Sequence, residues 1–141
     1  MENRPMLRPA PALSPEIAAL LSRAMFPDPA RIARVLAAYR TGPDRAVFVW
    51  EVGGVAVSAA GMRVAGAEAE VLHIGTRPDG TGQGHGRALL WAIAAHLKLS
   101  RLVAETDEDA VGFYRRSGFE IGGAPDRGGR RRFLCTLTLE R

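Results

Sequence analysis

Cysteine and lysine are each used once in this chain. Cys135 is the only cysteine, which excludes an internal disulfide and any metal site built from several thiolates. Its alternation with apolar neighbours predicts a buried residue in a strand. Lys98 is the only lysine among 19 basic residues, so arginine supplies nearly all of the positive charge.

Long apolar runs are also missing. No stretch approaches the roughly 20 apolar residues that cross a bilayer, and the first residues do not resemble a signal peptide. We therefore expect a cytoplasmic protein with no membrane partner and no bound metal. The length of 141 residues, 47% of them apolar and 24% charged, predicts one globular domain over residues 4–141.

Local signals outline the order of helices and strands. Ser14 and Asp28, each followed by proline, are typical helix caps, and Gly53-Gly54 is typical of a hairpin turn. The pattern predicts an α/β (α+β) fold with a mixed, mostly antiparallel sheet of six to seven strands and about four helices. We expect helices over 15–24, 29–41, 87–97 and 107–117, strands over 6–8, 46–52, 55–64, 68–76, 101–105 and 133–139, and a further strand that begins at 119–121.

The loop between the strand at 68–76 and the following helix carries the strongest functional signal. It contains Gly80, Gly82, Gly84 and Gly86 and opens directly into a helix, whose first amides lack internal acceptors. Glycines let a phosphate approach the backbone closely, so the loop predicts a pyrophosphate site. A P-loop is excluded because Arg87-Ala88 follows the last glycine, and G-x-G-x-x-G fails at Arg87.

Two motifs resemble the GNAT superfamily of N-acetyltransferases. The loop Thr81-Gly82-Gln83-Gly84-His85-Gly86 is similar to the family's Arg/Gln-x-x-Gly-x-Gly/Ala turn, with Thr81 at the first position. The segment 110–120 is similar to the family's A-x-x-F-Y-x-x-x-G-F helix and strand. The order of elements matches from about residue 4 to the C-terminus.

The resemblance implies acetyl transfer from acetyl-CoA to an amine, by direct attack in a ternary complex. Tyr114 would protonate the departing thiolate, the alternative being a core aromatic residue beside Phe113. Asp107 stands where many members have asparagine at the start of the penultimate helix. The cofactor would contact the strand backbone at Ile74, Gly75 and Thr76, the loop at Gly82, Gln83, Gly84, His85, Gly86 and Arg87, and also Asp107 and Tyr114. Neither Gly84 nor Gly86 falls in a predicted core stripe.

An amine with a pKa near 10.4 is protonated at neutral pH, so a base must help it to attack. Glu70 is the first candidate, because histone-acetylating members of the family place a glutamate at this spacing before the glycines; otherwise it is a solvated strand residue. His73 is the second, with a suitable pKa. In a regular strand these two side chains point to opposite faces, and only a bulge lets both serve.

Two other function classes stay open at this point. One is a non-catalytic acyl-CoA-binding regulatory module that keeps the glycine loop without a base. The other is an arginine-driven nucleic-acid binder, disfavoured because no aromatic residues interleave with the arginines at 127–132. The sequence does not identify the acceptor amine, and it allows a homodimer.

Overall fold

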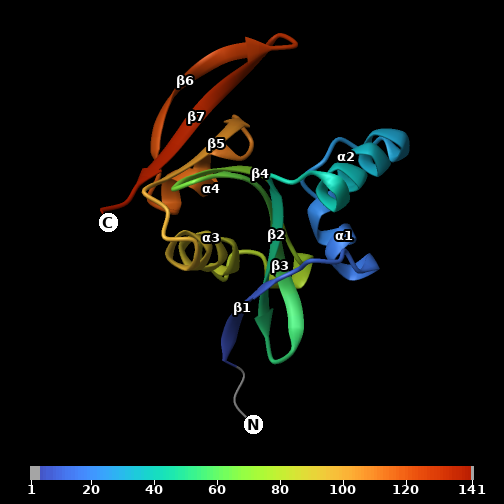
Figure 1. Cartoon of the computed structure of the whole chain (residues 1–141). Coiled ribbons are helices and arrows are strands. Elements are labelled where there is room, and N and C mark those ends of the chain that lie inside the picture. Colours follow the sequence, from blue (N-terminus) through green and yellow to red (C-terminus); the bar gives the residue numbers. More distant parts are fainter. Residues whose placement is uncertain (1–3, 141) are drawn as a thin grey trace.

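The computed structural model describes residues 4–140. Residues 1–3 and 141 lie outside this range, and residue 141 is the predicted end of the domain. Within it lie seven strands and four α-helices, shown in Figure 1. In chain order they are β1 (Pro5–Pro9), α1 (Pro15–Ser22), α2 (Pro29–Thr41), β2 (Arg45–Val52), β3 (Val55–Ala65), β4 (Glu68–Thr76), the 3₁₀ turn η1 (Pro78–Gly80), α3 (His85–His96), β5 (Arg101–Asp107), α4 (Val111–Arg116), β6 (Glu120–Arg127) and β7 (Arg130–Thr138).

All seven strands form one sheet in the order β1-β2-β3-β4-β5-β7-β6. The β4–β5 pair is parallel, and α3 connects these two strands. The remaining pairs are antiparallel. The predicted mixed sheet with about four helices is therefore confirmed. The β6–β7 hairpin extends beyond the body of the sheet (Figure 1).

Capping explains where the first two helices begin. The Ser14 side chain accepts a hydrogen bond from the Ile17 amide (3.2 Å), and Asp28 accepts from the amides of Ala30 (3.1 Å) and Arg31 (3.4 Å). Both caps confirm the prediction, since each occupies amides that have no acceptor within the helix.

The start of the last helix was predicted wrongly. The sequence pattern favours a helix from Asp107, but β5 continues through that residue and α4 begins at Val111. The Asp107 carboxylate accepts hydrogen bonds from the amides of Asp109 (3.0 Å) and Ala110 (3.2 Å). This local turn uses the amides that a longer helix would have placed in its first turn.

Two apolar clusters lie on opposite faces of the sheet. Beneath α3 and α4, Met62, Leu90 and Ile93 are fully buried, and Cys135 lies in the same cluster as predicted. Beneath α1 and α2, Leu21 and Val49 anchor the second cluster. The sheet thus separates two layers of helices, and β4 contributes side chains to both. None of the helices between residues 4 and 140 is long and apolar enough to cross a membrane.

Candidate active site

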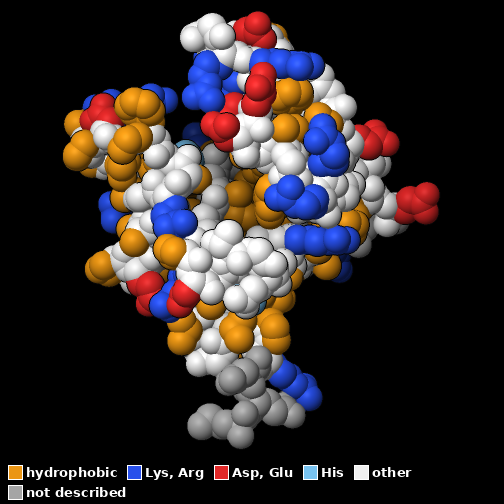
Figure 2. Space-filling model, turned by 180° about the vertical axis from the view of Figure 1, so that it is seen from behind, with side chains coloured by type: hydrophobic (Ala, Val, Ile, Leu, Met, Phe, Trp, Pro, Cys, Tyr) orange, Lys and Arg blue, Asp and Glu red, His pale blue; other side chains and the backbone are white. Residues whose placement is uncertain are grey.

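Strands β4 and β5 pair for only part of their length. Their parallel register runs from Glu68↔Arg101 to Val71↔Ala104 and then ends. Beyond it lies an open cavity of about 530 Å³. Figure 2 shows a hollow with an apolar floor on this side of the molecule. The cavity is lined from β4 by Leu72, His73, Ile74 and Thr76, from β5 by Glu105, Thr106 and Asp107, and from the helical segments by Arg23, Ala24, Asp109, Ala110, Phe113 and Tyr114, with Arg132 from β7.

A bulge in β4 decides which side chains reach this cavity. Gly61 of β3 pairs with His73, whereas the next residue, Met62, pairs with Val71, so Leu72 has no partner on β3. The extra residue puts Leu72 and His73 on the α1–α2 side, while Ile74 packs with the opposite cluster. The structure thus contains the bulge that the two candidate bases require.

His73 is held by a tyrosine from α2. The Tyr39 hydroxyl lies 2.6 Å from His73 Nδ1, and the two rings meet edge to face. Burial lowers the pKa of His73, and the guanidinium groups of Arg45 and Arg31 lower it further. The imidazole is therefore more fully neutral at pH 7 than an exposed histidine.

Gly61 provides the space for this contact. A Cβ atom at Gly61 would lie 2.2 Å from the Tyr39 ring, so only glycine fits opposite His73. Burial also raises the pKa of Tyr39, which keeps its phenol protonated at neutral pH. The sequence motifs did not single out Tyr39 as a site residue; the signal available was that a buried phenol needs a polar partner.

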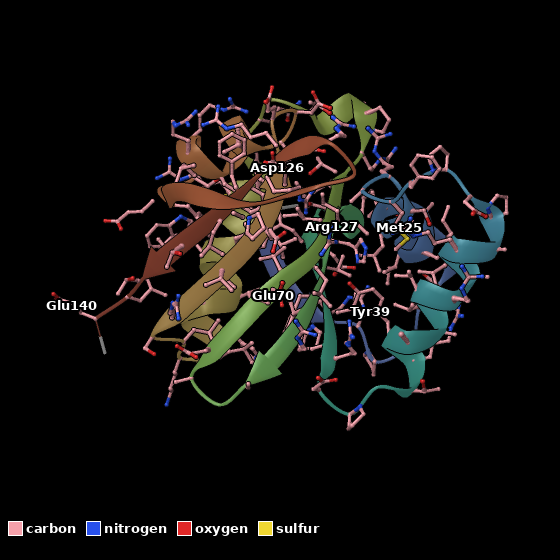
Figure 3. All side chains as sticks on the ribbon, turned by 90° about the horizontal axis from the view of Figure 1, so that it is seen from above. Met25, Tyr39, Glu70, Asp126, Arg127 and Glu140 are labelled. Carbon is pink, nitrogen blue, oxygen red and sulfur yellow. The ribbon has the colours of Figure 1, made fainter. Side chains whose placement is uncertain are left out.

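Glu70 lies on β4 without lining the cavity. Its carboxylate forms an ion pair with Arg63, its neighbour in register on β3. Figure 3 shows Glu70 on the sheet and Tyr39 on α2. Of the two candidate bases, His73 is the one that the structure brings to the cavity.

Tyr114 reaches the same cavity from α4. Only 6% of this residue is exposed. The rings of Phe113 and Phe119 meet its ring edge to face, with ring centroids 5.0 and 5.3 Å from that of Tyr114. Burial raises the pKa of the Tyr114 phenol, so its proton is retained at neutral pH. A protonated hydroxyl at this position can donate to a leaving group.

The glycine loop presents free amides at the start of α3. Gly84 caps the helix in a left-handed conformation (φ 80°), and the Ala88 amide donates to its carbonyl (3.0 Å). The amides of His85, Gly86 and Arg87 precede this first helical bond and have no acceptor in the helix. A Cβ atom at Gly82 or Gly84 would meet nothing within 4 Å, so the backbone there is accessible.

Gly86 has a different role from Gly84. It is buried, and a Cβ atom there would lie 2.9 Å from the Phe113 ring. The expectation that both glycines lie outside the core is therefore wrong for Gly86. Gln83 donates to the Asp79 carbonyl (3.3 Å) and Arg87 to the Arg116 carbonyl (3.2 Å), so both side chains fasten the loop to its surroundings.

Packing explains two other predicted cofactor residues. A Cβ atom at Gly75 would lie 1.8 Å from the Leu20 carbonyl oxygen, so α1 packs directly on its backbone. The Thr76 hydroxyl lies 3.0 Å from the Ser58 hydroxyl on β3. Neither contact uses the β4 edge that faces β5.

Arginines of the β7 strand reach the acidic side of the cavity. Arg132 lies 3.5 Å from Glu105, and Arg130 lies 3.1 Å from Asp109 and 3.9 Å from Asp107. The arginine run at 127–132 is thus partly committed to ion pairs beside the site.

A model of the acetyltransferase (GNAT) family matches residues 15–119. The chain belongs to this family. Solved structures agree in fold over nearly the whole chain. An acetyltransferase from Thermus thermophilus is 25% identical, with 99% of this chain and 100% of that chain covered and a TM-score of 0.68. Among curated protein sequences, none matches.

Two further GNAT relatives have the same fold at lower identity. The ribosomal-protein-S18-alanine N-acetyltransferase of Escherichia coli is 22% identical, with 98% and 96% of the chains covered and a TM-score of 0.71. A GNAT acetyltransferase from Elizabethkingia anophelis, solved with acetyl-CoA bound, is 18% identical, with 98% and 100% covered and a TM-score of 0.70. The protein is an acyltransferase of the GNAT family.

Proposed function

We propose that this GNAT protein transfers an acetyl group from acetyl-CoA to a primary amine by direct attack in a ternary complex. The observation that carries the proposal is the gap between β4 and β5, which brings His73 and Tyr114 to one cavity. The free amides at the start of α3 add an anion site.

The residues present fit acetyl-CoA. The backbone at Gly82 and Gly84 is accessible to a pyrophosphate, and beyond Val71 the β5-facing edge of β4 is unpaired. Ile74, Gly75 and Thr76 would pair with the pantetheine arm along that edge, as an added strand does. Bound acetyl-CoA supplies a thioester as the acetyl donor.

His73 is proposed as the base that takes the amine proton. Its lowered pKa keeps the imidazole neutral, and Tyr39 engages Nδ1, which leaves Nε2 to accept the proton. This role requires the tautomer in which Nδ1–H donates to the Tyr39 oxygen and Nε2 carries no proton. Glu70, ion-paired with Arg63, is the less favoured candidate.

Tyr114 is proposed as the acid that protonates the departing thiolate. Burial among Phe113 and Phe119 keeps its phenol protonated and holds the ring in place. A thiol with a pKa near 8.5 is already a fair leaving group, so the assistance should be modest, about 10²-fold.

Acetyl-CoA should stabilise the folded protein. At a hundredfold excess over its Kd, mass action predicts about 2.7 kcal/mol, because only the folded state forms the site. Thermal unfolding with and without acetyl-CoA measures this shift, and thiol release with a panel of primary amines tests transfer. A melting temperature that saturating acetyl-CoA leaves unchanged would refute cofactor binding.

Replacing Gly84 with valine should weaken acetyl-CoA binding at least tenfold, because the side chain enters the space of the pyrophosphate. Gly54→Val is the matched control: both glycines have φ of 80° and open surroundings, but Gly54 lies in the β2–β3 turn. Both variants should lose about 1–2 kcal/mol of stability from left-handed strain. Calorimetric titration with acetyl-CoA should then show weaker binding for Gly84→Val than for Gly54→Val. Equal affinities of the two variants would place the pyrophosphate elsewhere.

A further inference from the structure

A second open cavity lies on the α1–α2 side of His73. Its volume is about 490 Å³, and it shares Leu72 and His73 with the cavity between β4 and β5. Three arginines line it: Arg31 and Arg34 from α2, and Arg45 from the start of β2. Arg31 and Arg34 are three residues apart, so they lie on one face of the helix.

The charge of this second cavity is not neutralised. No carboxylate of residues 4–140 lies within 4 Å of the Arg31 or Arg34 guanidinium, and no acidic side chain lines the cavity. Of the three arginines, Arg45 has an ion-pair partner in this range, Asp44, at 3.6 Å. By contrast, Arg130 and Arg132 on the β7 side of the first cavity are paired with Glu105, Asp107 and Asp109.

Two of these arginines lie close enough to His73 to affect its protonation. Arg45 and Arg31 are the charged groups that lower the pKa of His73 after burial. A group bound by these guanidiniums therefore lies close to the proposed base. Between them the cavity wall is apolar, formed by Val35, Ala38 and Leu72.

We propose that this second cavity is an anion subsite for the acceptor, and that the acceptor is a small amine carrying a carboxylate or phosphate at its other end. Planar guanidinium groups bind both anions through paired hydrogen bonds. The amine then lies toward His73, with a short apolar spacer along Val35 and Leu72. A polycationic acceptor is disfavoured, because it would meet three guanidinium groups. This inference rests on the proposed acetyl transfer.

Matched amine pairs test the subsite. β-Alanine is compared with β-alaninamide, and 2-aminoethyl phosphate with ethanolamine, by the rate of thiol release from acetyl-CoA. We expect kcat/KM to be at least tenfold higher for the anionic member of at least one pair, and the better pair identifies carboxylate or phosphate. In the double variant Arg31→Gln/Arg34→Gln this preference should fall to near onefold, mainly through KM.

Arg40→Gln is the matched control, since Arg40 lies on α2 without lining the cavity. It should keep the preference. Equal turnover of charged and neutral amines, or a preference that survives in the double variant, would overturn the subsite.

A binding measurement separates this inference from the proposed function. With CoA saturating, 2-aminoethyl phosphate or β-alanine should raise the melting temperature of the wild type but not of the double variant. If no amine releases thiol yet this shift is seen, acetyl transfer to amines fails and the anion subsite stands. If neither amine is turned over preferentially nor stabilises the wild type, the subsite is refuted.

Discussion

Replacing His73 with glutamine should lower kcat by roughly 10²- to 10⁴-fold, the range that a positioned general base contributes. Glutamine retains a polar side chain of similar size but cannot take a proton. The affinity for acetyl-CoA should change little, because the proposed cofactor contacts are backbone groups of β4 and the glycine loop. Single-turnover acetylation of a fixed amine, with acetyl-CoA affinity measured separately, checks both expectations.

The pH dependence gives this prediction a second test. The lowered pKa of His73 keeps the wild-type base unprotonated at pH values where an ordinary histidine begins to charge. Raising the pH toward the amine's own pKa, about 10, supplies free amine without any base. The deficit of His73→Gln should therefore shrink as pH rises.

Two variants show whether the role belongs to His73. Glu70→Gln should have little effect on kcat, since the carboxylate meets Arg63 rather than the cavity. Tyr39→Phe should lower kcat less than His73→Gln while keeping the shape of the pH profile, because it loosens the imidazole without removing it. If Glu70→Gln shows the large, pH-sensitive loss and His73→Gln does not, Glu70 is the base.

Local signals made much of the fold predictable. The caps at Ser14 and Asp28 and the Gly53-Gly54 turn each act within a few residues, so the sequence pattern contains them completely. The glycine loop could be located for the same reason. The roles of Ile74 and Tyr114, however, came from the family resemblance and remain proposals.

The arrangement around His73 depends on distant residues. The β4 bulge appears only in the register with Gly61, and Tyr39 meets His73 across 34 positions of sequence. Neither the bulge nor the contact with Tyr39 leaves a recognisable mark on the pattern of apolar and polar residues in the sequence. The end of β4–β5 pairing at Val71 is likewise a property of two strands packed together.

Gly75 shows a similar limit and leads to the second large effect. Its predicted role was a backbone contact with the cofactor. The structure shows in addition that α1 packs so closely on Gly75 that no side chain fits there. Replacing Gly75 with alanine should destabilise the protein by about 3 kcal/mol, the upper part of the overpacking range. The new methyl group would meet the Leu20 carbonyl at 1.8 Å, and a backbone atom cannot rotate away as a side chain can.

Gly123→Ala is the control for this substitution. Gly123 also lies within a strand, β6, but a Cβ atom there meets nothing within 4 Å, so the variant should be as stable as the wild type. Urea unfolding of the two variants measures the difference as a shift in midpoint at constant slope. Because Arg23 and Ala24 follow α1 and line the cavity, a displaced helix should also weaken acetyl-CoA binding by Gly75→Ala. If Gly75→Ala unfolds at the wild-type midpoint, α1 does not rest on β4 at this residue, and that wall of the proposed active site must be placed elsewhere.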